Sequence, residues 1–371
     1  MTAAPRIYIS AGEPSGDAHA APVIAALRRR IPGAAIEAFG GPLMAQAGAA
    51  VLDRMEAFSV VGFVEAVGKI PAHYRLLDRV RGAFRAGRYD LAILVDYPGY
   101  HLRAAAAAAA AGVPVLYYIA PQLWAWGPGR VKKLAGAVRH LAVILPFEER
   151  FFRDRGVPAT FVGHPLLDRP GPPARAEARI ALGLDPGRPT LGVFPGSRGL
   201  EVKRLWPRFR AAAELVLARR PDVQVIAAAA LGAEYPDPGP VGIHGGNPRL
   251  VFAAADAALC KSGTTTLEAA IVDAPMVIAY RLNALSGFIA RRLLRVPWVG
   301  LVNLVADRAV APELLQREVR AEALASAVLP LLDPLSAEAR RQREGLALVR
   351  DRLGSPGAAE RVAALAAELL S

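Results

Sequence analysis

The sequence contains almost no cysteine. Cys260 is the single cysteine among 371 residues, which excludes an intramolecular disulfide framework and a zinc site built from clustered cysteines, and which fits a reducing compartment. Charged residues make up only 21% of the chain and hydrophobic residues 53%, a balance that excludes a disordered polyelectrolyte. The length is sufficient for two domains, each with a full core.

Lysine is also scarce, although the chain is strongly basic. Only five of the 45 lysine and arginine residues are lysines, and the formal net charge is +12. A coding bias towards alanine and arginine would explain part of this charge. The rest predicts an anionic partner, and the candidate classes are nucleic acid, an anionic membrane surface and a phosphorylated substrate.

We expect neither a signal peptide nor a membrane span. Residues 1–10 lack a charged region followed by an apolar core and a cleavage site. The longest stretch without charge, Ala104–Gly129, is interrupted by three prolines and begins with weakly hydrophobic alanines. It predicts a buried helix over Ala104–Ala111 and a buried strand over Val115–Ile119. The protein is therefore expected to be soluble or peripheral.

Short apolar runs without period-two alternation are separated by helical patterns such as Pro22–Arg30, Arg75–Arg85 and Glu201–Leu217. Such runs are typical of buried parallel strands. They are Ile7–Ser10, Leu91–Val95, Val115–Ile119, Leu141–Leu145 and Thr160–Val162, followed by Thr190–Phe194, Val223–Ala229, Val241–His244, Ala257–Cys260 and Met276–Tyr280.

A proline-rich break, Asp168–Arg175, divides these runs into two series. The pattern predicts two doubly wound, Rossmann-like α/β domains facing a central cleft, at residues 1–168 and 175–340. A helical tail, residues 341–371, is expected to pack back on a domain or on a partner subunit in a homodimer. Ligands bind at the carboxyl ends of strands in such sheets, so the loops after strands are the candidate sites.

Two loops of the first domain place a carboxylate directly after a predicted strand. Ser10–His19 carries Glu13 and two glycines, but it lacks the G-x-G-x-x-G fingerprint, which disfavours a nicotinamide or flavin cofactor. Asp96 ends the run Leu91–Val95, where partial burial would raise its pKa and suit a general base. The alternative in both loops is an acidic or hydroxyl side chain that caps a helix.

Two loops of the second domain are typical of phosphate binding. Pro195–Gly199 combines glycine, serine and arginine before a helix, and Lys261–Glu268 enters another helix through Gly263. Glu268 lies one helical turn past Thr264, within reach of a ribose. Together the two loops predict a pocket for a nucleotide diphosphate. The alternative is that both loops are ordinary turns. The chain has no Walker A loop, which argues against an ATPase, and no D-x-D pair, so no metal is indicated.

In combination these motifs resemble the lipid-A-disaccharide synthase family, over about Ile7–Gln316. The matching segments are Gly12–Asp17, Val95–Asp96, Tyr118–Trp126, Leu145–Glu148, Phe161–Pro165, Pro195–Arg198, Ser262–Glu268, Asn303 and Pro312–Gln316.

The resemblance implies a GT-B fold, no cofactor, and an inverting, metal-independent transfer. The donor is UDP-2,3-diacylglucosamine and the acceptor 2,3-diacylglucosamine 1-phosphate, whose 6-hydroxyl forms the β-1,6 disaccharide of lipid A. Asp96 is the implied base, and Glu13 orients the acceptor. The implied nucleotide-binding residues are Gly196, Ser197, Arg198, Ser262, Gly263, Thr264, Glu268 and Asn303. The implied residues on the acceptor or acyl-chain side are Ser15, Gln122, Trp124, Trp126 and His164.

The chain departs from the family pattern just after Asp96. Gly99, Tyr100 and His101 stand where the family commonly has a second aspartate, a phenylalanine and an asparagine. An acceptor contact made by that second carboxylate is therefore absent or replaced.

Acylated substrates imply a cytoplasmic enzyme that is peripheral on the inner face of the inner membrane. Two basic apolar segments, Lys69–Arg88 and Phe288–Trp298, are candidates for contact with anionic lipid. Ordinary surface helices packed on the core are the alternative. The candidate membrane-surface residues are Arg75, Arg79, Arg85, Arg291, Arg292 and Trp298.

Other functions share parts of this pattern. A different lipid-linked GT-B N-acetylglucosaminyltransferase, or a UDP-sugar 2-epimerase, would use a similar second-domain pocket. A lipid-binding protein that has lost catalysis would explain the departures after Asp96. A nucleic-acid-binding protein is supported only by the net charge, because no basic stripe with aromatic residues is apparent, so we expect no nucleic-acid partner.

Overall fold

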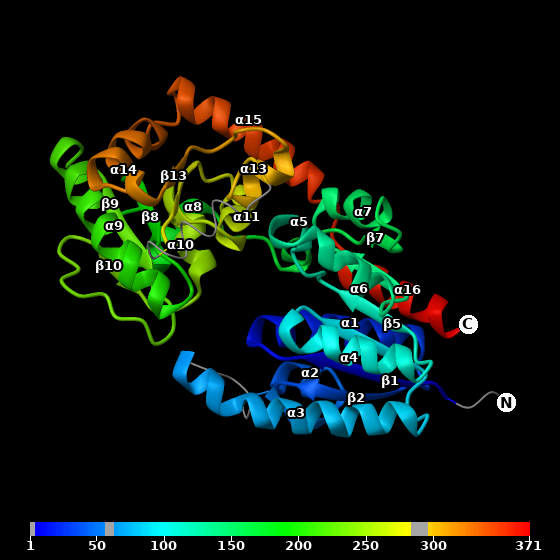
Figure 1. The fold of residues 1–371 in the computed structure, drawn as a ribbon. Coiled ribbons are helices and arrows are strands. Elements are labelled where there is room, and N and C mark those ends of the chain that lie inside the picture. The colour runs from blue at the N-terminus through cyan, green and yellow to red at the C-terminus, as the bar shows by residue number, and fades with distance from the viewer. Residues whose placement is uncertain (1–3, 56–62, 283–295) are drawn as a thin grey trace. The chain divides into compact units, whose positions relative to one another are not determined.

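The computed structural model describes the backbone of residues 4–55, 63–282 and 296–371 (Figure 1). The side chains of residues 63–70, 126 and 128 lie outside this description. The chain forms two compact units: Met1–Asp168 together with Gly354–Ser371, and Arg169–Leu353. Each unit is a parallel sheet covered by helices on both faces.

The first unit contains a seven-stranded parallel sheet in the order β3-β2-β1-β4-β5-β6-β7. Its strands are β1 (Arg6–Ala11), β2 (Ala35–Gly40), β3 (Ala50–Arg54), β4 (Leu91–Val95), β5 (Val115–Tyr118), β6 (His140–Val143) and β7 (Ala159–Phe161). Its helices are α1 (Pro14–Arg30), α2 (Pro42–Gln46), α3 (Phe63–Arg85), α4 (Pro98–Ala110), α5 (Leu123–Trp126), α6 (Val131–Ala135), α7 (Pro146–Arg153) and α16 (Ala358–Leu370), with 3-10 turns at Pro128–Arg130 and Pro165–Asp168.

Alternation along β1 explains how both faces of this sheet are covered. Ile7 and Ile9 lie in a core cluster with residues of α1 and α16, whereas Tyr8 lies in a second cluster with residues of α3 and α4. Because both faces are buried, the strands read as continuous apolar runs in the sequence. This is why the central strands could be predicted.

The second unit contains a six-stranded parallel sheet in the order β10-β9-β8-β11-β12-β13. Its strands are β8 (Thr190–Phe194), β9 (Gln224–Ala228), β10 (Gly242–His244), β11 (Ala257–Lys261), β12 (Met276–Tyr280) and β13 (Glu313–Leu315). Its helices are α8 (Arg175–Ala181), α9 (Gly199–Arg219), α10 (Pro248–Ala254), α11 (Thr264–Ile271), α13 (Leu301–Ala306), α14 (Ala321–Val328) and α15 (Ala337–Arg352), with 3-10 turns at Gln316–Glu318 and Leu329–Leu332.

Residues of β8 show that this sheet is also covered on both sides. Leu191 and Val193 pack in a cluster with α9 and α14. The ring of Phe194 stacks on Phe252 of α10 with 3.6 Å between centroids.

Both sheets have the strand order of a doubly wound fold, in which the order reverses beside the first strand. The switch point of the first sheet lies between β1 and β4, which pair with Ala11 opposite Val95. That of the second lies between β8 and β11, where Phe194 lies opposite Cys260. Ligands of such sheets bind at the carboxyl ends of strands at the switch point.

Several predicted strands are shorter in the structure, and two of them end early for a clear local reason. Ile119 has a φ of 62°, a left-handed conformation that ends β5 at Tyr118. β6 ends at Val143, because Leu145 is the N-cap of α7 and Pro146 begins that helix.

Three strands, β2, β3 and β13, do not appear among the predictions. β3 is an edge strand with an alternating exposed pattern, and β13 contains only three residues. Neither presents the continuous apolar run used to recognise the buried strands.

The helices that follow β1 and β4 begin earlier than the sequence suggests. α1 begins at Pro14 rather than Pro22, and α4 at Pro98. Proline is favourable at the first helical position, where its missing N–H needs no partner. Most of the predicted loop Ser10–His19, and the residues that follow Asp96 and Tyr97, therefore form first helical turns.

The predicted tail, residues 341–371, contains the end of α15 and all of α16, and these belong to different units. α16 packs along α1 in the first unit (Figure 1). Its N-terminus is capped by Asp168, whose carboxylate accepts the N–H groups of Gly357 at 2.6 Å and of Ala358 and Ala359 at 3.2 Å each.

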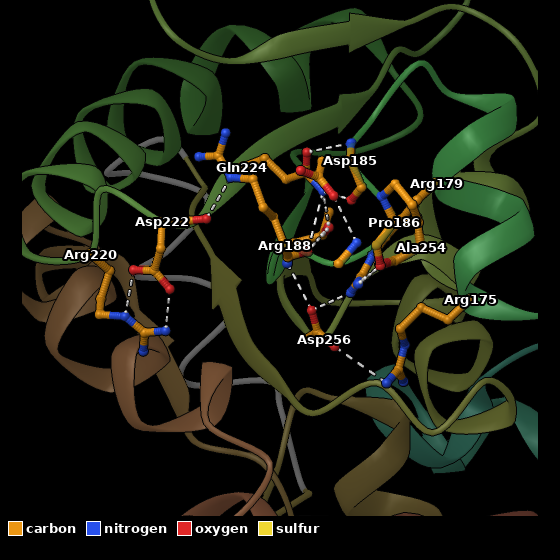
Figure 2. Close-up of polar contacts among 12 residues, drawn as sticks. Arg175, Arg179, Asp185, Pro186, Arg188, Arg220, Asp222, Gln224, Ala254 and Asp256 are labelled. Carbon is orange, nitrogen blue, oxygen red and sulfur yellow. Dashed lines mark hydrogen bonds and ion pairs between the residues drawn. The ribbon is translucent and has the colours of Figure 1, made fainter.

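A polar network lies at the amino ends of the strands of the second sheet (Figure 2). Asp256, which precedes β11, accepts the N–H of Thr190 at 2.7 Å and pairs with Arg179 and, at 3.3 Å, with Arg175. Arg179 is only 6% exposed and also donates to two backbone carbonyls. Because the network lies at the end of the sheet opposite to the ligand-binding end, we assign it to stability.

Candidate active site

Glu13 and Asp96 emerge at the switch point of the first sheet. Glu13 follows β1 as the N-cap of α1, and its side chain is exposed. Asp96 directly follows β4 and is partly buried. The carboxylate of Glu13 lies near Tyr97, whose pKa is raised mainly by burial and further by the charge of Glu13. The two predicted carboxylates are thus brought to one end of one sheet.

Tyr97 joins the two loops that carry these carboxylates. A Cβ atom at Gly12 would lie 2.3 Å from the Tyr97 ring, so the first loop requires glycine there. The Tyr97 hydroxyl is 2.7 Å from His73 Nε2 on α3. Tyr97 has a φ of 50°, an uncommon left-handed conformation for an aromatic residue.

The backbone of Asp96 is fixed by hydrogen bonds on both sides. Its φ is 51°, again left-handed. Its N–H donates to the Tyr118 carbonyl at 2.9 Å, and its own carbonyl accepts from Tyr117 Oη at 2.6 Å and from His101 Nδ1 at 2.7 Å. These bonds hold the residue in a conformation that would otherwise cost free energy, and they set the direction of its side chain.

The hydrogen bonds of His101 define its tautomer. The side chain is fully buried, and burial lowers its pKa to about 4, so the imidazole is neutral near pH 7. A carbonyl can only accept, so Nδ1 carries the proton towards Asp96. Nε2 then accepts from the Ser10 hydroxyl, 2.7 Å away. His101 thus donates to the backbone of the candidate base.

Gly99 has space around it. A Cβ atom at this position would meet no atom within 4 Å. Crowding at the Cβ position therefore does not explain why glycine stands here.

Two residues expected on the acceptor side are core residues. The Trp124 indole is 6% exposed and its N–H donates to Glu148 at 2.9 Å, while His164 is 3% exposed and its Nδ1 accepts from Leu166 at 3.2 Å. Their contact with the acceptor stays a prediction. Ser15 and Gln122 are exposed, and the side chain of Trp126 lies outside the described residues.

Glu148, which sequence reasoning did not single out, organises this region. It is fully buried, and burial raises its pKa to about 7, against the lowering effect of its bond to Trp124. It also accepts the N–H of Leu145 at 3.0 Å, which caps α7. The spacing of Leu145 and Glu148 was the available signal, because a glutamate three residues past an N-cap is typical of a capping box.

In the second unit, the loop after β8 presents Gly196, Ser197 and Arg198. Gly196 has a φ of 137°, which favours glycine. The Ser197 N–H donates to Glu201 at 3.1 Å, and Arg198 is the exposed N-cap residue of α9. This loop begins α9, whose 21 residues direct their positive dipole end to the carboxyl end of β8.

The loop after β11 lies next to it at the same switch point. Gly263 has a φ of 138°, and Thr264 is the exposed first residue of α11. Ser262 is buried, and its hydroxyl donates to the Val299 carbonyl at 2.6 Å. Glu268 forms an ion pair with Arg169 at 3.3 Å. Burial raises the pKa of Glu268, while Arg169 and Arg249 oppose this shift.

Asn303 is held by hydrogen bonds within the second unit. It is fully buried; its amide nitrogen donates to Glu313 at 2.8 Å and to Ala311 at 2.9 Å, while its oxygen accepts from Val310 and Ala311. All its hydrogen-bonding capacity is used within the unit. A contact of Asn303 with the nucleotide stays a prediction. Within the unit Asn303 orients Glu313, which accepts the N–H groups of Val299 and Gly300 at 2.9 Å each.

On residues 71–85, the part of α3 whose side chains the structure describes, the candidate membrane surface carries exposed arginines. The hydrophobic residues of this helix that motivated the prediction are buried against the sheet: Leu76, Leu77, Val80 and Phe84. An apolar stripe that faces the core cannot also enter a lipid surface. Arg75 and Arg85 are exposed, and Arg79 pairs with Asp53.

Of the second basic segment, Phe288–Trp298, the structure describes only residues 296–298. Arg291 and Arg292 lie outside the described residues, and Trp298 is partly buried. None of the helices in residues 4–55, 63–282 and 296–371 combines the length and apolarity needed to cross a membrane.

Two doubly wound α/β domains in one chain, each with its candidate residues at the switch point of a parallel sheet, define the GT-B class of fold. Within that class the sequence relationship is specific. The family model of lipid-A-disaccharide synthetase matches residues 7–364, and the chain belongs to this family.

Known relatives agree with this assignment. The chain is 41% identical to the lipid-A-disaccharide synthase of Geobacter metallireducens over 375 residues, which cover 98% of this chain and 97% of that one. Among solved structures the chain is similar to a putative UDP-N-acetylglucosamine 2-epimerase from Listeria monocytogenes, with a TM-score of 0.66 and 11% sequence identity. The match covers 97% of this chain and 95% of that one. The glycotransferase of kitacinnamycin gives a TM-score of 0.64, 18% identity and 99% coverage of each chain. At such identities the likeness concerns the fold alone.

Proposed function

We propose that the chain transfers 2,3-diacylglucosamine from UDP to the 6-hydroxyl of 2,3-diacylglucosamine 1-phosphate. The products are the β-1,6 lipid A disaccharide 1-phosphate and UDP. Membership of the lipid-A-disaccharide synthetase family supports this reaction. The observation that carries its mechanism is the position of Asp96 beside Glu13 at the switch point of the first sheet.

In this mechanism Asp96 is the general base. It accepts the proton of the 6-hydroxyl while that oxygen bonds to the anomeric carbon, on the face opposite to the diphosphate. The bond from the anomeric carbon to the diphosphate oxygen breaks, and UDP departs with the electron pair. Glu13 orients the acceptor. Positive charge and N–H groups of the second unit stabilise the departing diphosphate.

The nucleotide is held by the two loops of the second unit. Arg198 and the N–H groups of the Ser197 and Thr264 loops suit the diphosphate oxygens. Glu268, partly buried on α11, faces the ribose.

The reaction is tested with both purified lipids. The chain is incubated with donor and acceptor together and with each alone, and products are followed by mass spectrometry. We expect the disaccharide and UDP only when both substrates are present. Absence of the disaccharide would reject the proposal, and an epimerised sugar from donor alone would favour a UDP-sugar 2-epimerase.

Replacing Arg198 with alanine should weaken UDP binding. Its guanidinium is exposed at the start of α9 and would make charge-assisted hydrogen bonds to the diphosphate. Losing bonds of this kind costs about 1.5–3 kcal/mol, or roughly 10- to 100-fold in Kd. Isothermal titration with UDP measures the change, and Arg219→Ala at the other end of α9 is the matched control. Unchanged affinity in Arg198→Ala would move the diphosphate site elsewhere.

We also propose that the enzyme works on the inner face of the inner membrane, with the exposed arginines of α3 meeting anionic lipid. Changing Arg75, Arg79 and Arg85 to glutamate should weaken binding to phosphatidylglycerol vesicles, because each basic residue near such a surface contributes about 1 kcal/mol. Vesicle co-sedimentation measures the loss. The same charge change at Arg219, Arg340 and Arg341, which are exposed in the second unit, is the control. Equal binding by both triple variants would reject the surface.

A further inference from the structure

One carboxylate joins the two nucleotide loops of the second unit. Glu201 lies in the first turn of α9, and its Oε2 accepts the Ser197 N–H at 3.1 Å. Its Oε1 pairs with Lys261 Nζ at 2.8 Å, where Lys261 ends β11. The side chains of Glu201 and Lys261 are each 20% exposed. Donors from both loops therefore converge on a single anionic group.

Two glycines of these loops, Gly196 and Gly263, lie against this pair. A Cβ atom at Gly196 would be 2.6 Å from Glu201 Cβ and 2.7 Å from Oε2. A Cβ atom at Gly263 would be 3.6 Å from Lys261 Nζ. Because these positions are glycine, the Glu201 carboxylate has space next to the exposed backbone of the two loops.

The surroundings keep the Lys261 ammonium at this position. Lys261 Nζ lies 5.9 Å from the centre of the Tyr280 ring, within the range of a cation–π contact. The pKa of Tyr280 is raised by burial and further by the charge of Glu201. Ring and carboxylate together place the positive charge between the two loops.

We infer that Lys261 is a diphosphate-binding residue. Before the nucleotide binds, the Glu201 carboxylate pairs with the Lys261 ammonium and accepts the Ser197 N–H. The diphosphate of the nucleotide then displaces this carboxylate from both donors. A carboxylate and a phosphate use the same donors, and the diphosphate carries more negative charge. Lys261 would then neutralise the charge that develops on the departing UDP. This inference rests on the proposed function, because it assigns the ligand of the same two loops.

Replacing Lys261 with methionine tests the contact directly. Binding of UDP and of uridine is measured by isothermal titration. We expect the UDP affinity to fall roughly 10- to 100-fold, the range for a charge-assisted hydrogen bond, while uridine affinity is unchanged. Lys203→Met, on the exposed side of α9, is the matched control. Lys261→Gln repeats the test if the methionine variant has a lowered Tm.

Equal UDP affinity in wild type, Lys261→Met and Lys203→Met would overturn the inference and leave the Glu201 pair as a structural contact only. Failure of the wild type to bind UDP would instead reject the proposed function. An equal loss for UDP and uridine would show a general disturbance of the pocket, and it would also overturn the inference.

Replacing Glu201 with glutamine tests the exchange. Glutamine keeps an oxygen that can accept the Ser197 N–H, but it removes the charge that competes with the diphosphate. We expect UDP affinity to rise about fivefold, the equivalent of a partly exposed ion pair near 1 kcal/mol. A lower UDP affinity in Glu201→Gln would show that the carboxylate belongs to the bound state, and the exchange would be wrong.

Discussion

Replacing Asp96 with asparagine should reduce kcat by about 10²- to 10⁴-fold, the usual contribution of a general base. Asparagine has nearly the same shape and keeps the backbone groups that bind Tyr117, Tyr118 and His101, so the loop should retain its conformation. It cannot accept the proton of the acceptor hydroxyl. UDP affinity should be unchanged, because the nucleotide loops belong to the second unit.

The measurement is steady-state product formation, combined with UDP titration of the same preparation. Asp90→Asn is the matched control, since Asp90 is exposed at the opposite end of β4 and accepts the Arg6 N–H, which asparagine can also do. Nearly normal kcat in Asp96→Asn would contradict the assignment of the base. Loss of both kcat and UDP binding would point to misfolding rather than lost chemistry.

Replacing Arg179 with methionine should lower the free energy of unfolding by about 3–5 kcal/mol, the cost of removing one partner from a buried ion pair. Arg179 is 6% exposed and joins Asp256 to two backbone carbonyls in the network of Figure 2. Methionine retains much of the apolar stem but leaves these acceptors without their donors. Urea denaturation monitored by circular dichroism measures the change.

Arg175→Met is the control for this prediction. Arg175 pairs with the same carboxylate of Asp256, but its side chain is 38% exposed, and such pairs contribute only about 0–1 kcal/mol. A large difference between the two variants supports the structural role of the buried pair. Equal losses for Arg175→Met and Arg179→Met would contradict it.

The central strands and the loops after them were predictable because their signals are local. Leu91–Val95, Thr190–Phe194 and Met276–Tyr280 are predicted to the residue, since strands buried on both faces contain almost only apolar side chains. The parallel topology then explains why Glu13 and Asp96, far apart in the sequence, lie at the same end of one sheet.

The residues that support the site could not be found in this way. The bonds of His101 to Ser10 and of Lys261 to Glu201 join segments that are distant in the sequence, and nothing local marks them. Asn303 and Trp124 illustrate the converse case. They lie in motifs of the family, yet their polar atoms are used within the fold, and burial could not be read from residue type.

The central claim, an inverting transfer to the 6-hydroxyl of the acceptor, is tested most directly by the linkage in the product. Proton and carbon NMR of the disaccharide made by the purified chain identify the linked carbon and the anomeric configuration. The proposed mechanism predicts a β linkage to carbon 6 from an α-linked UDP donor. An α linkage, or a bond to another hydroxyl, would contradict it.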